Sequence, residues 1–264
     1  MFQLTREVRF AVNDRPDEQL AHAPTNSYGG YPSLRGFGHY LALVASVSGE
    51  IDSASNYLIN IREIDALVRK AAIPLVIDAI SGPRRRRPEQ VVAAIFDTLR
   101  PAWPGLALDA VRLSLSPFLS YSAHAQELPM VRLSQKFEFS ATHRLHNAEL
   151  SEEENRRVFG KCANPHGHGH NYELQVTLAG QPDANGVLID IPRFETIVAE
   201  TVVDRFDHKN LNIELPEFRE LIPTVENIAR VIYRLLKPPL TRQGIVLASV
   251  TVWETPKTWC EYSE

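Results

Sequence analysis

Cysteine and long apolar runs are both scarce in this chain of 264 residues. Its two cysteines, Cys162 and Cys260, are too few for a disulfide scaffold, so we expect free thiols of the kind found in cytosolic proteins. The longest apolar runs, such as residues 40–45, are far shorter than the ~20 residues that span a bilayer. The charged N-terminal residues predict no secretory signal there. We therefore expect a soluble, cytoplasmic protein with no membrane partner.

Neither sign of charge is in large excess, because the chain has 28 Lys and Arg and 32 Asp and Glu, for a net charge of −4. Nucleic-acid binders usually carry a positive footprint, so we expect no nucleic-acid partner. Apolar residues make up 44% of the chain, which excludes disorder. The length suits two domains of roughly 100–150 residues each.

The chain resembles itself in four segments that occur in the same order twice. The segment from Gly38 (GHYLALVASVSGEID) and the segment from Gly169 (GHNYELQVTLAGQPD) share a Gly-His start, an alternating strand and a Gly-x-x-Asp turn. The other pairs are VRFAV with KFEFSATH, PEQVVAAIFDTL with VENIARVIYRLL, and AVRLSLS with SVTVWET. This self-similarity predicts two copies, residues 1–127 and 128–264.

Each copy is predicted to run strand, strand, helix, helix, strand, strand. In the second copy Tyr172, Leu174 and Val176 alternate on one strand face, and residues 228–236 follow a helical period. This order predicts an α+β fold, with a four-stranded antiparallel sheet and two helices on one face in each copy. Open sheet edges tend to pair or close, so we expect the sheets to join on oligomerisation.

The densest chemical signal is a histidine-rich segment, CANPHGHGH, that runs from Cys162 to His170. Residues two apart in a strand share a face, so His168 and His170 can reach one ion. His143 ends the preceding strand and joins them if the two strands pair. Three imidazoles with an open fourth position form the layout of a catalytic zinc site, so we predict Zn²⁺ there. Spacing alone leaves His166 as a competing ligand, and no convincing fourth protein ligand is apparent, although Cys162 is close in sequence.

Four further residues have both a functional and a structural explanation. Cys162 is either a small buried hydrophobe or a reactive thiolate. Asp207 beside His208 can tune proton transfer, but on its own the pair is better explained as a polar turn after a helix. Glu254 ends a strand in apolar surroundings, where a carboxylate can accept two hydrogen bonds from an amidine-like edge. The alternative for Glu254 is a solvated strand end.

Local structure is sufficient to explain several other polar residues. Ser151 begins a capping box for a short helix. Thr224 is the expected N-cap of the next long helix, and Glu226 lies in its first turn, where a carboxylate favours the helix dipole. The run Arg84–Arg87 is predicted to be a solvated loop, with phosphate binding as the lesser alternative.

Five motifs of the second copy together resemble the 6-pyruvoyltetrahydropterin synthases. In chain order they are FSATHRL, FGKCANPHGHGHNY, FDHKNLN, PTVEN and VWET, and the resemblance covers Gln135 to Tyr262. It implies the tunnelling fold, in which subunits join sheets into trimeric barrels that stack in pairs. It also implies a lyase that converts 7,8-dihydroneopterin triphosphate to 6-pyruvoyltetrahydropterin, with elimination of triphosphate, as in tetrahydrobiopterin biosynthesis.

The resemblance assigns the metal and the base. It implies zinc on His143, His168 and His170, with His166 outside the coordination shell. It implies that Cys162 is the base that moves substrate protons.

The resemblance also assigns the remaining site. Asp207 and His208 would form a partner acid–base pair contributed by a neighbouring subunit. Glu254 would anchor the aminopyrimidine edge of the pterin, and Thr224 and Glu226 would take part in substrate binding.

Two alternatives to this activity stay open. In the 6-carboxytetrahydropterin synthases of queuosine biosynthesis, which share fold, zinc and substrate, the cysteine precedes the first histidine of the HGH pair by four residues rather than six. Cys162 satisfies both spacings, through His166 and through His168. The surrounding loop is more similar to the pyruvoyl-forming enzymes. The other alternative is a zinc- or pterin-binding protein without turnover.

The first copy departs from the motif pattern. Phe37-Gly38-His39 stands where the second copy has His-Gly-His, no histidine ends its first strand, and Leu115 aligns with Glu254. We predict that this copy binds no zinc and has no catalytic activity. If the family's assembly holds, three chains would give one barrel of active copies stacked on one of inactive copies, which predicts a homotrimer with three zinc ions.

Overall fold

The computed structural model describes residues 1–14, 30–34, 36–83, 85–103 and 105–264. Arg84, the first residue of the arginine run, lies outside these ranges. The chain divides into two compact units, one of residues 1–133 with 180–188 and one of residues 134–179 with 189–264. The predicted boundary between residues 127 and 128 lies close to the first of these divisions and stays a prediction.

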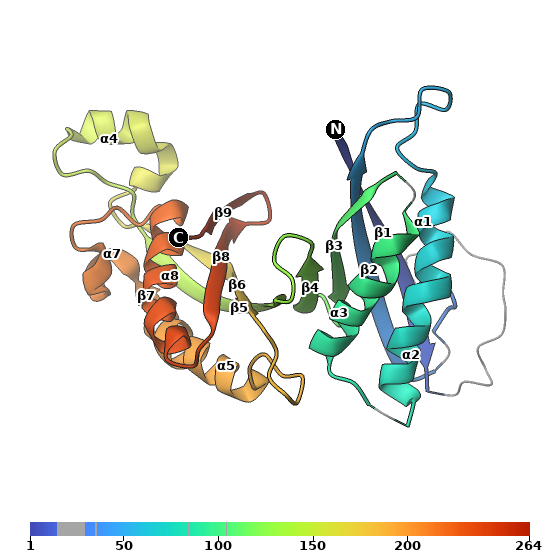
Figure 1. The fold of residues 1–264 in the computed structure, drawn as a ribbon. Coiled ribbons are helices and arrows are strands. Elements are labelled where there is room, and N and C mark those ends of the chain that lie inside the picture. Colours follow the sequence, from blue (N-terminus) through green and yellow to red (C-terminus); the bar gives the residue numbers. More distant parts are fainter. Residues whose placement is uncertain (15–29, 35, 84, 104) are drawn as a thin grey trace. The chain divides into compact units, whose positions relative to one another are not determined.

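The first unit is an antiparallel sheet with its helices on one face (Figure 1). Its strands pair in chain order, β1-β2-β3-β4, and α3 packs on β3 and β4. The strands are β1 (Phe2–Asn13), β2 (Gly38–Gly49), β3 (Ala107–Ser114) and β4 (Leu119–His124). The helical segments are α1 (Ile61–Leu67), the π-helical η2 (Val68–Ala72), α2 (Ile73–Ser81), α3 (Pro88–Leu99) and the 3₁₀ turn η3 (Arg100–Ala102).

The second unit repeats this plan and adds short elements around the ends of its strands. Its sheet has the order β5-β6-β8-β9, with β7 paired in parallel to β5. The strands are β5 (Val131–His143), β6 (His168–Gly180), β7 (Lys209–Asn210), β8 (Val246–Thr255) and β9 (Thr258–Tyr262). The helical segments are α4 (Glu152–Phe159), η4 (Gly160–Ala163), α5 (Ile191–Val198), η5 (Ala199–Val203), α6 (Asp204–Phe206), α7 (Leu211–Glu214), η6 (Pro216–Phe218) and α8 (Val225–Thr241).

Apolar alternation and helix caps account for the second unit. Along β6 the side chains of Tyr172, Leu174 and Val176 are fully buried, and α8 packs on β8 and β9 over the resulting core. Ser151 caps α4 in a reciprocal bond with Glu154, as the sequence predicts. The Thr224 hydroxyl accepts from the amide of Asn227 at the start of α8, as predicted. The α+β prediction is confirmed.

The two units share irregular features at corresponding places. The β2–β3 ladder shifts register between Ser46 and Val47, and the β6–β8 ladder shifts between Thr177 and Leu178. Each unit also carries a five-residue π-helical segment, η2 or η5, inside its first helical layer. Such segments are rare, well under 1% of residues. The units therefore resemble each other in detail as well as in plan.

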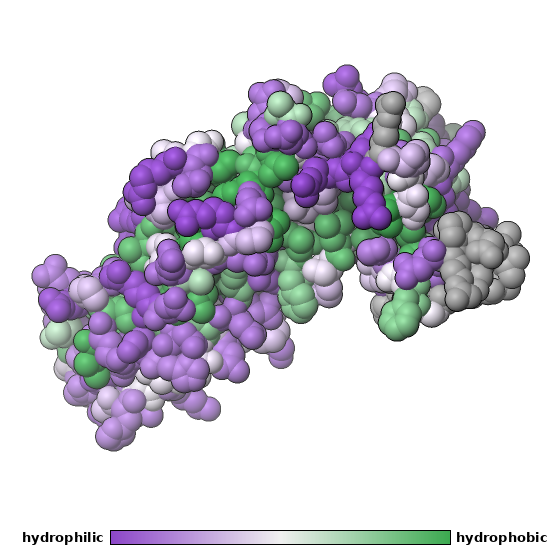
Figure 2. Space-filling model, turned by 90° about the horizontal axis from the view of Figure 1, so that it is seen from below, coloured by the Kyte–Doolittle hydropathy of each residue, from purple (hydrophilic) through white to green (hydrophobic). Residues whose placement is uncertain are grey.

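The surface of the face shown in Figure 2 is mostly hydrophilic, with hydrophobic patches between polar side chains. Within the described ranges, no helix has both the length and the apolar character needed to traverse a bilayer. The exposed apolar residues include Phe37 and Ile213, which are 89% and 78% accessible.

Candidate metal centre

Three histidines and one carboxylate converge at one end of the second sheet. His143 ends β5, His168 and His170 begin β6, and Glu254 lies near the end of β8. The Nε2 atoms of His143 and His168 are 3.1 Å apart, and Oε1 of Glu254 lies 3.2 Å from His143 Nε2 and 3.5 Å from His170 Nε2. Ligand atoms about 2.0–2.1 Å from a tetrahedral zinc ion lie about 3.3 Å from one another. This group could hold a metal ion.

The hydrogen bonds of the histidines favour a cation over a proton-shared cluster. Nδ1 of His143 lies 2.8 Å from the carbonyl oxygen of Pro223, and as a donor to that oxygen it leaves a lone pair on Nε2 of a neutral ring. That lone pair faces Glu254, which is itself an acceptor. Nε2 of His170 is buried without a hydrogen-bond partner among the described residues. Facing lone pairs at these distances fit a shared metal ion.

Electrostatics keep the imidazoles in the form that binds metals. Burial lowers the pKa of His168, and the neighbouring histidines lower it further. Burial likewise lowers the pKa of His170, although Glu254 opposes the shift. The close approach of His143 lowers the pKa of Glu254, against the opposing effect of burial. These shifts favour neutral rings at His168 and His170 and an ionised carboxylate at Glu254. Together with His143 they form a three-nitrogen, one-oxygen donor set suited to zinc.

Glu254 is the member of this group that sequence reasoning did not place beside the histidines. The sequence analysis gives it a pterin-anchoring role and finds no fourth protein ligand, whereas the structure places its carboxylate against the imidazoles. The signal that could have revealed this is strand alternation. Glu254 is two residues beyond the buried Val252, so it shares a face with that core residue, and β8 pairs with β6, which carries His168 and His170. Its predicted role in pterin binding stays a prediction.

Cys162 lies in the turn η4, and its carbonyl oxygen accepts from the amide of Leu145. Burial and then the charge of Glu254 raise the pKa of its thiol, so Glu254 is its electrostatic neighbour. His166 is exposed, and the metal group of the described residues does not include it. The geometry thus favours His168 over His166 as a ligand, and the assignment stays a prediction.

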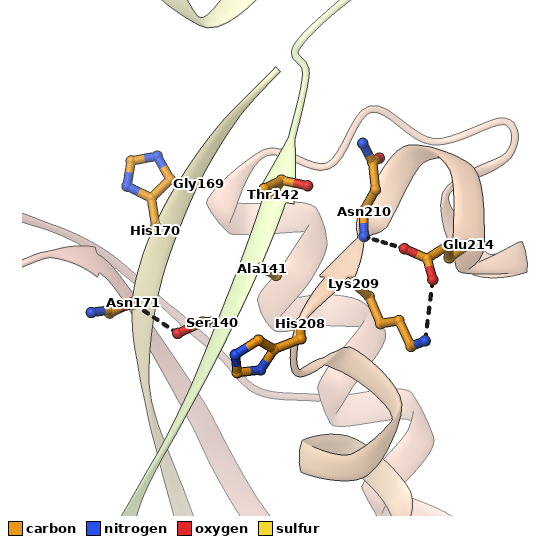
Figure 3. A pocket seen from close by; sticks show the side chains of 10 residues that line it. All are labelled: Ser140, Ala141, Thr142, Gly169, His170, Asn171, His208, Lys209, Asn210 and Glu214. Atoms are coloured by element: carbon orange, nitrogen blue, oxygen red, sulfur yellow. Dashed lines mark hydrogen bonds and ion pairs between the residues drawn. The ribbon is translucent and has the colours of Figure 1, made fainter. Parts of the chain in front are cut away.

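Asp207 and His208 form a separate pair beside a pocket of about 540 Å³. Figure 3 shows His208 near Ser140 of β5 and Lys209 of β7. Nδ1 of His208 lies 2.7 Å from Asp207, whose carboxylate also accepts from the amide of Ser140. The hydrogen bond from the Ser140 amide, and then the one from His208, lower the pKa of Asp207. The backbone of His208 is left-handed (φ 57°) and its side chain is 83% exposed, so the ring is held outward.

The two predicted substrate-binding residues on α8 lie at its N-terminus. Thr224 caps the helix, and Glu226 in its first turn is exposed. Glu226 also contributes to the raised pKa of Cys260, after burial, so the two side chains are near each other. The roles of Thr224 and Glu226 in substrate binding stay predictions.

A three-histidine, one-carboxylate group at the end of an antiparallel sheet defines an α+β protein with a site that could hold a metal ion. Residues 132–264 match the family model for 6-pyruvoyl tetrahydropterin synthase. The chain therefore belongs to that family, and the resemblance seen in the sequence is confirmed.

Individual relatives cover about half of this chain. The human 6-pyruvoyl tetrahydrobiopterin synthase is 41% identical over 125 residues, which are 47% of this chain and 85% of the relative. The 6-carboxy-5,6,7,8-tetrahydropterin synthase of Haemophilus influenzae is 29% identical over 156 residues, covering 51% of this chain and all of that protein. The solved structure of Caenorhabditis elegans 6-pyruvoyl tetrahydropterin synthase is 37% identical, covers 52% of this chain and 98% of its own, and has a TM-score of 0.49.

Proposed function

We propose that the second unit is a zinc-dependent lyase that converts 7,8-dihydroneopterin triphosphate to 6-pyruvoyltetrahydropterin with elimination of triphosphate. The observation that carries the proposal is the convergence of His143, His168, His170 and Glu254, in a chain of this family. The higher identity to the human enzyme than to the carboxy-forming one supports the pyruvoyl product over the carboxy product.

The chain's own residues supply proton transfer at this site. When bound, zinc supplies Lewis acidity that eases deprotonation of the carbon next to hydroxyls it chelates. Cys162, electrostatically coupled to Glu254, is the proposed base on one side of the substrate. No external redox cofactor is needed, because the oxidation and reduction both occur within the substrate.

We propose that Asp207 and His208 complete the site of a neighbouring chain. The exposed His208 ring, paired with Asp207, is accessible to groups outside its own unit. A carboxylate beside an imidazole holds the ring in one tautomer and one orientation. Loss of either residue should therefore lower turnover while the metal content stays normal.

We also propose that the chain is a tandem pair of tunnelling-fold copies, residues 1–127 and 128–264, that assembles as a homotrimer of six copies. The matching register shifts and the matching π-helical segments support the duplication. Because the shared site needs active copies side by side, three chains would form one active and one inactive barrel. A native mass of three chains with three zinc ions is expected, and a hexamer of chains would contradict the assembly.

Product identification tests the function directly. Zinc-loaded protein incubated with 7,8-dihydroneopterin triphosphate should release triphosphate and a product with the mass of 6-pyruvoyltetrahydropterin. A product with the mass of 6-carboxytetrahydropterin would move the chain to the queuosine-type activity. Substrate returned intact, with zinc bound, would support the binding protein instead.

A further inference from the structure

Tyr172 is a buried side chain whose hydroxyl has no partner. Its ring is fully buried on β6, two residues after His170, and stacks on Phe139 at 5.0 Å between centroids. The ring centroid lies 5.5 Å from that of His170 and 6.1 Å from that of His143. The hydroxyl is one of few buried side-chain atoms in the described ranges without a hydrogen bond. An unpaired buried hydroxyl lowers the stability of the folded state, because it has lost its hydrogen bonds to water. We therefore expect it to gain a partner in the functional state.

The nearest acceptor in the strand register is Glu254. The β6–β8 ladder pairs Glu173 with Trp253, so the next position along the ladder places Tyr172 opposite Glu254. Side chains directly opposite on one face have Cβ atoms about 4.5–5.5 Å apart. Glu254 also acts electrostatically on the Tyr172 phenol, more strongly than Cys162 does. The carboxylate and the phenol are thus neighbours on one face of the sheet.

Metal binding changes which donors Glu254 can use. In the structure its Oε1 faces the Nε2 atoms of His143 and His170. A metal held by those two nitrogens occupies their lone pairs, so neither ring can carry a proton there to share with the carboxylate. The second oxygen of Glu254 is then open to another donor. Tyr172 is the adjacent buried donor that has none.

We propose that Tyr172 is a positioning residue that donates its hydroxyl hydrogen bond to Glu254 when the metal is bound. The bond fixes the carboxylate against the metal and satisfies the buried hydroxyl in the same step. It acts on metal affinity through Glu254 and need not touch the substrate. The inference rests on the proposed metal site and not on the identity of the reaction product.

Zinc affinity tests the inference without any assay of turnover. Wild type, Tyr172→Phe, Glu254→Ala and the double variant are titrated with zinc against a competing chelator. Removing an outer partner of a ligand typically weakens metal binding about 10–100-fold, and we expect a loss of that size for Tyr172→Phe. In the Glu254→Ala background the same change should cause no further loss, because the acceptor is already gone.

A second buried tyrosine provides the matched control. The hydroxyl of Tyr233 is paired, with the carbonyl of Leu247 at 3.1 Å. Tyr233→Phe should therefore lower the melting temperature and leave zinc affinity unchanged, whereas Tyr172→Phe treated with chelator should melt at or above wild type. Unchanged zinc affinity in Tyr172→Phe, or an equal loss in the Glu254→Ala background, would overturn the inference alone. A wild-type chain that binds no zinc would overturn the proposed site as well.

Discussion

The two units of this chain are built alike and differ at one end of their sheets. Both have a first strand of a dozen or so residues, a second of similar length, a register shift in the next ladder and a π-helical segment. The strand interiors follow the apolar alternation that a half-buried sheet requires. The same plan of fold therefore occurs in two units whose corresponding described positions carry different side chains, so the fold does not by itself specify the site.

Corresponding strand positions show what the first unit lacks. When the two units are aligned on their register shifts, Phe37 takes the position of His168. On the next strand, Leu115 takes the position of Glu254. Phe37 is 89% exposed. Two donor positions in the first unit thus hold apolar side chains, which cannot bind a metal ion.

The last residues of the first strands, Asn13 and His143, differ in their hydrogen bonds. Asn13 ends β1 as His143 ends β5, and both side chains are nearly inaccessible. The Asn13 amide donates to the carbonyl of Ser33, while His143 uses one nitrogen for Pro223 and leaves the other for the cluster. A structural polar residue satisfies itself within the fold, whereas a ligand keeps one lone pair unsatisfied.

The largest expected effect comes from removing a metal donor of the second unit, with the removal of a histidine of the first unit as the control. His168→Ala should lose the zinc ion and with it essentially all turnover, a loss beyond the roughly 10–100-fold that an outer-shell change costs. The control His39→Ala alters the first unit and should keep one zinc per chain and normal turnover. Metal analysis of purified protein and a turnover assay measure both. Zinc lost from the control, or kept in His168→Ala, would contradict the assignment.

The two cysteines of the second unit differ in their proposed roles, so their substitutions should have different effects. Cys162→Ala should lower turnover by about 10²–10⁴-fold, the usual contribution of a general acid or base, with zinc content unchanged. Cys260→Ala provides the control, because Cys260 faces Val252 on the edge strand β9 and has no proposed role. Steady-state kinetics and metal analysis decide the matter. Full activity in Cys162→Ala would remove this thiol from the mechanism.

A mixture of two inactive variants tests whether neighbouring active copies share a site. Cys162→Ala chains and His208→Ala chains, mixed equally and allowed to exchange subunits, should regain activity. If the two variants occupy the ring at random, each of the two residues is intact in half of the chains. About a quarter of the interfaces then pair an intact Cys162 with an intact His208. Turnover near that fraction of wild type supports the shared site. Activity no greater than that of the separate variants, after verified exchange, would place both residues in one chain.

Much of the fold could be predicted because its determinants are local. Alternation along residues 172–178 and the caps at Ser151 and Thr224 depend on neighbours in sequence, and the structure has these elements as predicted. The π-helical segments could not be foreseen, because they depend on how a helix packs over a sheet. The short strand β7 was also missed, since its two residues pair with β5 only through the tertiary fold.

The site was predictable to the extent that its donors are close in sequence. His168 and His170 share a strand face, and pairing of β5 with β6 brings in His143. Glu254 lies on β8, more than eighty residues later in the chain. Its contact with the imidazoles therefore depends on the register in which β8 pairs with β6. The same applies to Tyr172, whose unpaired hydroxyl is visible only once the surrounding partners are known.

The smallest expected effect concerns His124, a histidine of the first unit that lies outside the candidate metal group. His124 bonds Ser122, and burial, followed by the charge of Arg132, lowers its pKa below the ordinary value of 6.5. Below about pH 6.5 the unfolded chain takes up a proton at His124 that the folded chain resists, so the free energy of unfolding falls as pH falls. Melting temperatures between pH 7.5 and 5.5 should therefore decline more steeply for wild type than for His124→Gln, which cannot titrate. Parallel curves would show that His124 contributes nothing to the acid sensitivity of this unit.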